Sequence, residues 1–384
     1  MARATVRFIP QTGEDLTAMA KTTYRTDQVG SLLRPTSLLD ARDAYRNGRL
    51  EAAELKRQQD AAILEALERQ QQCGVDIYTD GEMRRDAWQT NFAHAADGFD
   101  PKYPILELPG PDGKIAKLEM HTQIINGKIT RKGRIAEQDA AFLKKNSPGP
   151  FKITMPSPNY IARMGYRPGI TDKVYTDFSV LHSDVTGIIR GEMEALVADG
   201  ASYIQLDEGF VYYVSSLLQS QIKVADLEKA LVADIAAENS CYDAVRDQVT
   251  VAMHVCRDSR VSWMHGETGY DWLAERLFNT LHVDRFLLEY DLEYEHGFEP
   301  LRFLPKGRVV VLGLISSKDG NLESVDKLCR RIDQAAKYCS LEQLALTSQC
   351  GFQAAADLDG AHMGTTEQWA KIKLMGDVAR KVWG

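Results

Sequence analysis

The sequence predicts an α/β fold, a (β/α)8 or TIM barrel that carries an insertion after its second strand. Eight short apolar runs recur along the 384 residues, and helical patterns fill most of the gaps between them. Several runs, such as VVVLGLI, are apolar on both faces, as in parallel strands that helices cover on both sides. Strand and helix alternate without an internal repeat or a flexible linker, which indicates a single barrel domain over residues 1–384.

The eight runs expected to form the barrel strands have recognisable helices between them. In chain order the runs are residues 24–31, 77–81, 151–158, 201–209, 248–256, 285–291, 308–316 and 344–351. Residues 51–72 are dense in strong helix formers, residues 179–198 carry apolar side chains near helical spacing, and residues 366–382 form the last expected helix. In the expected helix 323–339 a single apolar stripe ends at Cys339, which places that cysteine in the core.

The gap between the second and third expected strands, about residues 89–150, is too long for one helix. It contains the stretch GPDGKIAKLEMHTQIINGKITRKG, in which DGK and NGK turns lie among β-branched residues. This pattern predicts an inserted hairpin. An insertion after a strand would lie above the mouth of the barrel, where it would serve either as a lid or as a contact in a homo-oligomer.

The composition excludes several classes of partner. Lys and Arg total 46 against 54 Asp and Glu, so the net charge is −8, and no basic surface for nucleic acid is expected. No apolar run approaches the roughly 18 residues that would span a membrane. The N-terminus has no apolar segment typical of a signal peptide, and Glu14 and Asp15 disfavour a transit peptide. We therefore expect a cytoplasmic protein.

The six cysteines do not form a disulfide framework, because they show no repeated short spacing. We expect reduced thiols, as is usual in the cytosol. Cys73, Cys241 and Cys329 have no partner pattern and receive no functional role. The remaining question is whether Cys256 or Cys350 is a metal ligand.

Polar or metal-ligating residues lie at the end of nearly every expected strand. In barrels of this kind the active site forms at the carboxyl ends of the strands. A barrel with a purely structural role would not need this pattern. These residues are Ser31, Asp80, Glu82, Ser157, Asp207, Glu208, His254, Cys256, Glu289, Asp291, Ser316, Ser317, Lys318, Gln349 and Cys350.

The most informative motif is the pair His254-x-Cys256, because residues two apart on a strand point to the same face. Glu289 and Cys350 reach the same rim from the sixth and eighth strands. One imidazole, two thiolates and one carboxylate form a suitable tetrahedral zinc set. From spacing alone an alternative stays open, in which the cysteines are small buried apolar residues and the histidine is part of the core.

Glu82 and Asp207 are carboxylates at neighbouring strand ends. They form either loop caps and ion pairs, for example with Arg84 or Arg85, or a binding site for the ammonium group of an amino-acid substrate. In the second case Ser31, with nearby backbone N–H groups, would bind the substrate carboxylate. Lys318 is a candidate catalytic cation, a contact for an anionic substrate group, or a solvated loop residue.

With these residues in view, the chain resembles the cobalamin-independent methionine synthase family, in its short single-barrel branch within the superfamily that includes uroporphyrinogen decarboxylase. The resemblance covers the chain from about residue 24 to its end. Eight stretches in the right order carry it: DQVGSLLRP (27–35), GVDIYTDGEMRR (74–85), ITMPSPNY (153–160), YIQLDEG (203–209), MHVCRDS (253–259), FLLEYD (286–291), VVLGLISSK (310–318) and LTSQCGF (346–352).

The resemblance implies specific roles for the residues described above. The zinc ligands of the family fall on His254, Cys256, Glu289 and Cys350. Its homocysteine contacts fall on Ser31 for the carboxylate, and on Glu82 and Asp207 for the amino group. The implied activity is zinc-dependent transfer of a methyl group to the thiol of homocysteine, which forms methionine. The implied partners are this thiol and a methyl donor.

Three departures limit what the resemblance implies: the first two bear on the methyl donor, and the third on the shape of the pocket beside the metal. Longer enzymes of the family have an additional N-terminal barrel, which this chain lacks. They also place a histidine proton donor after the seventh strand, where this chain reads Ser316-Ser317-Lys318. The segment after the metal motif, Arg-Gly-Asn in close relatives, is 257–259, Arg-Asp-Ser, here. We therefore expect methylfolate to be a poor donor, and methylcobalamin or a sulfonium compound to be a better one.

Two other functions are weighed against this one. Epoxyalkane:coenzyme M transferases are similar to the family and open an epoxide with a zinc-bound thiolate, but coenzyme M has no amino group to pair with Glu82 and Asp207. A metal-free lyase like uroporphyrinogen decarboxylase would not need His254, Cys256 or Cys350. The sequence therefore favours an amino-acid thiol as the acceptor.

Overall fold

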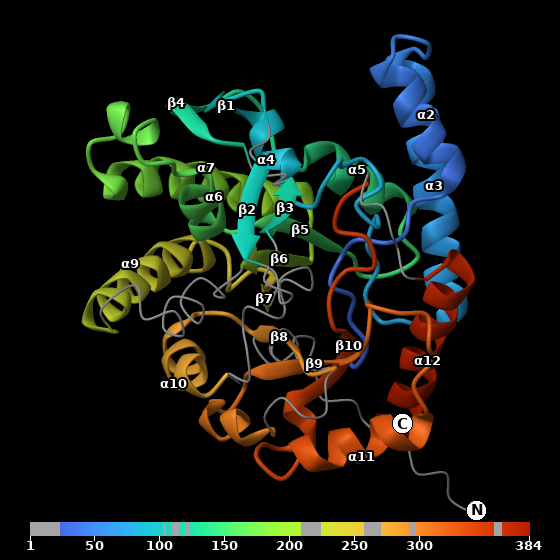
Figure 1. Ribbon diagram of the computed structural model, residues 1–384. Coiled ribbons are helices and arrows are strands. Elements are labelled where there is room, and N and C mark those ends of the chain that lie inside the picture. The colour runs from blue at the N-terminus through green and yellow to red at the C-terminus, as the bar shows by residue number, and fades with distance from the viewer. Residues whose placement is uncertain are drawn as a thin grey trace, which may run out of the picture.

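The computed structural model describes residues 24–102, 105–109, 115–119, 123–208, 224–256, 270–291, 297–356 and 363–384, and contains a parallel sheet of six strands (Figure 1). The strands are β5 (Lys152–Pro156), β6 (Tyr203–Glu208), β7 (Thr250–Val255), β8 (Arg285–Glu289), β9 (Val309–Ile315) and β10 (Leu344–Ser348). Each strand lies beside its neighbour in the sequence, in the order β10–β9–β8–β7–β6–β5. The predicted α/β class with a parallel sheet is confirmed.

The first two expected strands, residues 24–31 and 77–81, are joined to this sheet by single bridges. Thr26 forms a parallel bridge to β10, and Tyr78 forms one to the residue just before β5. The two segments meet where the backbone N–H of Leu32 donates to a carbonyl of the second segment at 3.0 Å. The eight segments therefore follow one another in the cyclic order of a barrel, but two of them are not continuous strands.

Side chains explain why these two segments lack a regular ladder. The carboxylate of Asp76 accepts the backbone N–H groups of Arg25 (2.6 Å) and Thr26 (2.9 Å). In return, the hydroxyl of Thr26 accepts the backbone N–H of Asp76 at 2.6 Å. Backbone donors that a continuous ladder would use are thus satisfied by side-chain oxygens, which the apolar pattern of the sequence does not reveal.

The helices lie around the outside of the strands (Figure 1). They are α2 (Thr36–Arg46), α3 (Ala52–Cys73), α6 (Pro158–Gly165), α7 (Phe178–Asp199), α9 (Val224–Tyr242), α10 (Asp271–Thr280), α11 (Val325–Ala335) and α12 (Thr365–Trp383), with short 3-10 turns at Thr171–Lys173, Glu299–Phe303 and Leu341–Gln343. The expected helices match α3, α7 and α12 closely, whereas α11 ends four residues before Cys339. That cysteine is half-buried and packs against the core. No described helix is long and apolar enough to cross a membrane.

The segment between the second and third barrel positions contains two antiparallel pairs, one nested inside the other. Its elements are α4 (Thr90–Ala95), β1 (Ala96–Phe99), β2 (Ile105–Pro109), β3 (Ile115–Glu119), β4 (Ile125–Arg131) and α5 (Glu137–Asn146). Strand β1 pairs with β4, and β2 pairs with β3 between them. Strand β4 packs against α7. The role of this segment as a lid or an oligomer contact stays a prediction.

A second, smaller apolar cluster fills the inner face of the sheet. Nearly every barrel position contributes to it, and its members are Val29, Ile77, Tyr203, Ala252, Leu287, Val309, Val311 and Ala345. Residues two positions further along the strands continue on this inner face. The packed inner face therefore forms a floor beneath the polar residues at the carboxyl ends of the strands.

One buried ammonium group, that of Lys152 on β5, organises the polar part of this floor. Its Nζ donates to Asp27 Oδ1 (2.7 Å), to Gln205 Oε1 (2.7 Å) and to the carbonyl of Gln28. The hydroxyl of Tyr203 donates to the other oxygen of Asp27 at 2.8 Å. Burial by itself would raise the pKa of Asp27, but the charges of Lys152 and Arg285 lower it, so the aspartate stays ionised.

Lys152→Met should lower the free energy of unfolding by about 3 kcal/mol or more, because it leaves the charge of Asp27 buried without its main partner. Urea denaturation measures this loss. Lys373→Met is the matched control, since Lys373 pairs with Asp377 on the surface at 3.0 Å, and it should change stability by at most about 0.5 kcal/mol. Equal urea midpoints for the parent protein and Lys152→Met would contradict the role of this ion pair.

Candidate active site

The register of the parallel strands brings the candidate residues to one edge of the sheet. Asp207 on β6 lies opposite His254 on β7, and Glu289 on β8 lies opposite Gly313 on β9. Cys256 follows directly after β7, two residues beyond His254, and therefore reaches the same side. Functional groups of neighbouring strands thus converge at the carboxyl ends of the strands.

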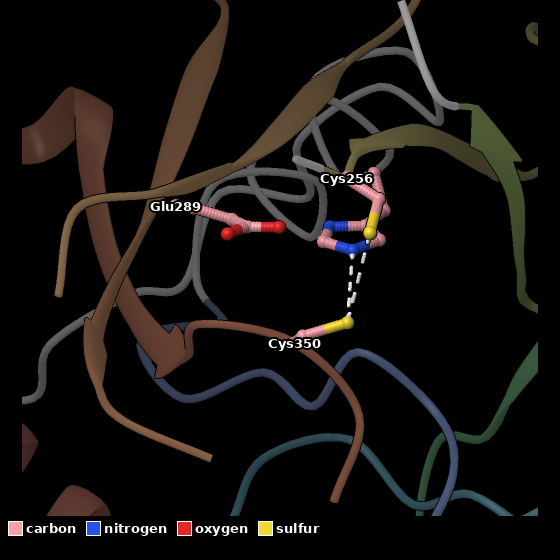
Figure 2. A group of neighbouring side chains, drawn as sticks. Cys256, Glu289 and Cys350 are labelled. Carbon is pink, nitrogen blue, oxygen red and sulfur yellow. Dashed lines mark hydrogen bonds between the residues drawn. The ribbon is translucent and has the colours of Figure 1, made fainter. Parts of the chain in front are cut away.

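Four ligand-type side chains meet at this edge. One ligand atom from each of His254, Cys256, Glu289 and Cys350 lies within 4.8 Å of all the others. The two sulfur atoms are 3.9 Å apart, and Cys350 Sγ is 3.8 Å from His254 Nε2. Figure 2 shows Cys256, Glu289 and Cys350 pointing toward a common point from three different segments. The sequence prediction that these residues come together agrees with this geometry.

The spacing of the ligand atoms can be compared with a tetrahedral zinc ion. Bond lengths of about 2.3 Å to sulfur and about 2.0 Å to nitrogen give S···S near 3.8 Å and S···N near 3.5 Å in a tetrahedron. The observed 3.9 and 3.8 Å are within a few tenths of an ångström of these values. The donor set and its spacing therefore fit a single tetrahedral metal ion.

The environment of His254 keeps its imidazole neutral. The side chain is buried, and burial together with the positive charge of Lys152 lowers its pKa to about 3. A neutral imidazole has a nitrogen lone pair available, which a metal ligand requires. The ring is thus in the form needed for coordination at any pH near neutrality.

A local irregularity in β10 places Cys350. The pairing of β10 with β9 shifts register between Thr347 and Ser348, opposite the stretch that contains Gly313. A Cβ atom at Gly313 would lie 2.7 Å from the carbonyl oxygen of Leu288 and 2.9 Å from Cα of Gln349. Only glycine allows this close approach, so the glycine in VVVLGLI is needed for the strand end that carries the cysteine.

Ser31 is buried between the two halves of the site. Its carbonyl accepts the backbone N–H of Phe352 at 2.9 Å, and its side chain lies against Gly351, next to Cys350. On the other side, a Cβ atom at Gly30 would lie 2.7 Å from Glu82 Oε1. The backbone at Gly30 and Ser31 therefore connects the cysteine side of the site with the carboxylate side.

Glu82 is held in a strained and buried position. Its φ of 57° lies in the left-handed region, which a residue with a side chain rarely adopts. Its Oε1 accepts the hydroxyl of Thr154 at 2.8 Å and lies 3.3 Å from Arg85 Nη1. Its Oε2 is buried and has no hydrogen-bond partner among the described residues. The carboxylate thus retains an acceptor for a further donor.

The ion pair with Arg85 was one of the two alternatives for Glu82, and the structure contains it. Arg85 also donates to the hydroxyl of Thr154 (3.1 Å) and to the carbonyl of that residue (2.8 Å), so its guanidinium is shared among several acceptors. Arg84 instead contacts Asp60 and Asp139. The ion pair therefore supports the orientation of Glu82 and leaves its Oε2 available.

Asp207 lies on the inner face of β6, above Lys152. The side-chain amide of Gln205 donates to Asp207 Oδ1 at 2.6 Å. Burial raises the pKa of Asp207 well above its ordinary value, and the nearby charge of Glu82 raises it further. Burial also raises the pKa of Glu82, against the opposing charge of Arg85. The two buried carboxylates therefore repel each other when both are ionised.

Lys318 lies at the rim after β9, in a position that differs from that of the buried residues. Its Nζ is 3.1 Å from Asp291 Oδ2, and its side chain is 26% exposed. The carboxylate of Asp291 is buried and follows Glu289 by two residues. Lys318 therefore belongs to an ion pair beside the candidate metal ligands, and its catalytic role stays a prediction.

Sequence reasoning gave no role to the residues that support the site. Gln205 contacts Asp207, Thr154 contacts Glu82, and the side chain of Gln349 contacts Glu289. Two of them had a usable signal: Gln205 precedes Asp207 by two residues and must share its face, and Gln349 lies among the polar residues at the strand ends. The segment 257–259, which departs from the family pattern, lies outside the described residues.

Comparisons with known proteins agree with this site and fold. The family described as cobalamin-independent synthase, catalytic domain, matches residues 120–381. The chain belongs to this family. The predicted family is thereby confirmed. The Bacillus subtilis protein YxjG is 33% identical over 94% of this chain and 96% of its own length.

More distant members of the cobalamin-independent synthase family give the same result. The methionine synthase of Sulfurisphaera tokodaii is 25% identical over 85% of this chain and 86% of its own length. The solved structure of a putative vitamin-B12-independent methionine synthase from Listeria monocytogenes superposes with a TM-score of 0.72 at 27% identity, covering 94% of this chain and 98% of that one. The chain therefore shares its fold with relatives of similar length.

The charge state of Asp207 predicts a pH-dependent stability. Its folded pKa is raised above its ordinary value, so at pH values between the two the folded state holds a proton that the unfolded state has released. This contribution to stability is complete below the ordinary pKa and is lost as pH rises through the folded pKa, by at most about 1.4 kcal/mol for each pH unit. Asp207→Asn cannot ionise and escapes this loss.

Asp207→Asn should therefore be more stable than the parent protein at pH 8, and the difference should shrink toward pH 4. Thermal unfolding across this pH range measures it. Asp97→Asn, at an exposed position on β1, is the control and should show no such trend. A difference between Asp207→Asn and the parent protein that does not change with pH would contradict the raised pKa.

Proposed function

We propose that this protein transfers a methyl group to the thiol of homocysteine, forming methionine, and that it uses a zinc ion held by His254, Cys256, Glu289 and Cys350. The observation that carries the proposal is the convergence of these four ligand atoms, all within 4.8 Å of one another, beside a pair of buried carboxylates. Membership of the cobalamin-independent synthase family supports it. The methionine synthases among the relatives support the choice of substrate.

The chemistry of thiol methylation requires a thiolate at neutral pH. A free thiol with a pKa near 8.5 is only a few per cent ionised at pH 7. A zinc ion held by these four residues would favour the thiolate form of the substrate thiol at neutral pH and would leave its sulfur nucleophilic. The sulfur then forms a bond to the methyl carbon as the bond from carbon to the donor breaks, and the electron pair leaves with the donor.

The residues of the chain bind and orient the amino-acid part of the substrate. Glu82 Oε2 is buried and lacks a donor among the described residues, and an ammonium group would supply one. The pKa of Asp207 is raised in the free protein, and a substrate ammonium would favour its ionised form and relieve the repulsion between the two carboxylates. Ser31 lies between these carboxylates and Cys350, where its hydroxyl would bind the substrate carboxylate.

The buried carboxylates also separate this function from its alternatives. A coenzyme M thiol carries a sulfonate and no ammonium, so it would leave Glu82 and Asp207 without a cation. A metal-free decarboxylase would have no need for two thiols and a neutral imidazole within 4.8 Å of a carboxylate. An amino-acid thiol uses both parts of the site.

Two variants should separate zinc binding from substrate binding. Cys350→Ser removes a thiolate ligand, so the purified protein should lose most of its zinc. Glu82→Gln keeps the size of the side chain and removes its charge, so zinc content should be unchanged while homocysteine binds roughly tenfold to a hundredfold more weakly. Metal analysis and calorimetric titration provide the two readouts. Cys339→Ser, outside the cluster, is the control for both.

The deaminated analogue of homocysteine tests the carboxylate assignment directly. The parent protein should bind it more weakly than homocysteine, and Glu82→Gln should reduce that difference. Equal binding of the two thiols by the parent protein would exclude an ammonium site at these carboxylates. Full zinc in Cys350→Ser would show that the metal site is elsewhere.

The methyl donor is predicted from the residues after β9. Departure of a folate N5 requires a proton on that nitrogen, because an amine anion is a very poor leaving group. Lys318 occupies the place of the family's histidine, and its Nζ lies in an ion pair 3.1 Å from Asp291 Oδ2, so this position has no imidazole to relay the proton. Methylcobalamin or a sulfonium donor requires no such proton. Rapid turnover with methyltetrahydrofolate that Lys318→Ala leaves unchanged would show this prediction to be wrong.

A further inference from the structure

The side chain of Gln349 connects two strand ends inside the candidate site. It is 1% exposed and directly precedes Cys350. Its Nε2 donates to Glu289 Oε2 at 2.7 Å, and its Oε1 accepts the hydroxyl of Ser317 at 2.8 Å. Its backbone N–H donates to the carbonyl of Ile315 at 2.7 Å. Three barrel positions, β8, β9 and β10, are therefore joined through one amide.

The chemistry of these groups permits one orientation of the amide. An ionised carboxylate only accepts hydrogen bonds, so the NH2 group of Gln349 must face Glu289. The amide oxygen then faces Ser317, whose hydroxyl must donate to it. The chain of donors runs in one direction, from Ser317 through Gln349 to Glu289. Removal of the hydroxyl would leave the amide oxygen buried without its partner and would release the amide from this orientation.

The backbone places Gln349 for this contact. The register shift between Thr347 and Ser348 redirects the end of β10, and Gly313 permits the close approach of Cα of Gln349. The same irregularity that positions Cys350 therefore positions the amide beside Glu289. The positions of Cys350 and of the Gln349 amide therefore both depend on the register shift in β10.

We propose that Gln349 is a positioning residue for Glu289, and that Ser317 acts through Gln349. This inference rests on the proposed zinc site. By binding Oε2, the amide fixes the orientation of the carboxylate and would leave Oε1 to serve as the ligand oxygen, without adding charge to the cluster. Hydrogen-bond partners of metal ligands commonly contribute tenfold to a hundredfold to metal affinity, because they fix the orientation of the ligand before the metal binds.

The test measures zinc affinity by competition with a chromogenic chelator. Gln349→Met keeps the length of the side chain and removes both polar groups, so the dissociation constant for zinc should rise about tenfold to a hundredfold. Ser317→Ala should weaken binding less, and Ser317→Thr, which keeps a hydroxyl, should retain the parent affinity. Gln343→Met is the matched control, because the amide of Gln343 donates to the carbonyl of Pro305 away from the cluster.

The double variant distinguishes an oriented chain of hydrogen bonds from a general loss of packing. If Ser317 acts only through Gln349, then Ser317→Ala should have no further effect on zinc affinity in the Gln349→Met protein. The visible spectrum of the cobalt-substituted protein gives a second readout, since the altered carboxylate should change its intensity in Gln349→Met and leave it unchanged in Gln343→Met. Additive effects of the two substitutions would overturn the role of Ser317.

The outcomes separate this inference from the function on which it rests. A parent protein that binds no zinc overturns the proposed function. A parent protein that binds zinc tightly, with the same affinity in Gln349→Met, overturns the positioning role and leaves the function intact. If Gln349→Met does not fold, the Ser317 variants decide the question: weaker binding in Ser317→Ala but not in Ser317→Thr supports the proposal, and equal binding in both overturns it.

Discussion

The ammonium group of Lys152 is fully buried, and the placement of several other groups depends on it. It binds Asp27 at 2.7 Å, on a segment whose backbone is joined to the sheet by a single bridge. Four residues further along that segment, Ser31 enters the candidate site. The same ammonium binds Gln205 at 2.7 Å, and because an ammonium only donates, the amide of Gln205 must turn its NH2 group toward Asp207.

The candidate site contains the same arrangement twice: a glutamine amide that lies between a hydrogen-bond donor and a carboxylate. On one side, Lys152 fixes Gln205, and Gln205 fixes the carboxylate of Asp207. On the other side, Ser317 fixes Gln349, and Gln349 contacts Glu289. In each case a donor binds the oxygen of a side-chain amide, so that the NH2 group of the amide faces a carboxylate. The amide orients the carboxylate without adding charge. Functional side chains that must hold one geometry need such supporting contacts.

The conformation of the candidate site lowers the stability of the protein without its substrate. Glu82 and Asp207 are buried with raised pKa values, and Glu82 adopts a backbone conformation that favours glycine. These features lower stability, and the proposed binding of a substrate ammonium would explain them. Binding of the substrate ammonium would satisfy the open oxygen of Glu82 and relieve the repulsion between the carboxylates. Stability and function are therefore in opposition here, as is common in active sites.

The sequence by itself determined the class of the fold and the four candidate metal ligands. Periodicity identified the strands of the sheet and most helices, and the spacing of His254 and Cys256 placed both on one face, because these features depend on neighbours in the chain. Local sequence patterns could not predict that Asp76 accepts the backbone donors of a strand ladder, that Arg85 and Thr154 both contact Glu82, or that Gln349 binds Glu289. Most of these contacts join residues tens of positions apart, and a local pattern carries no information about which distant side chain will meet a given hydrogen-bonding group.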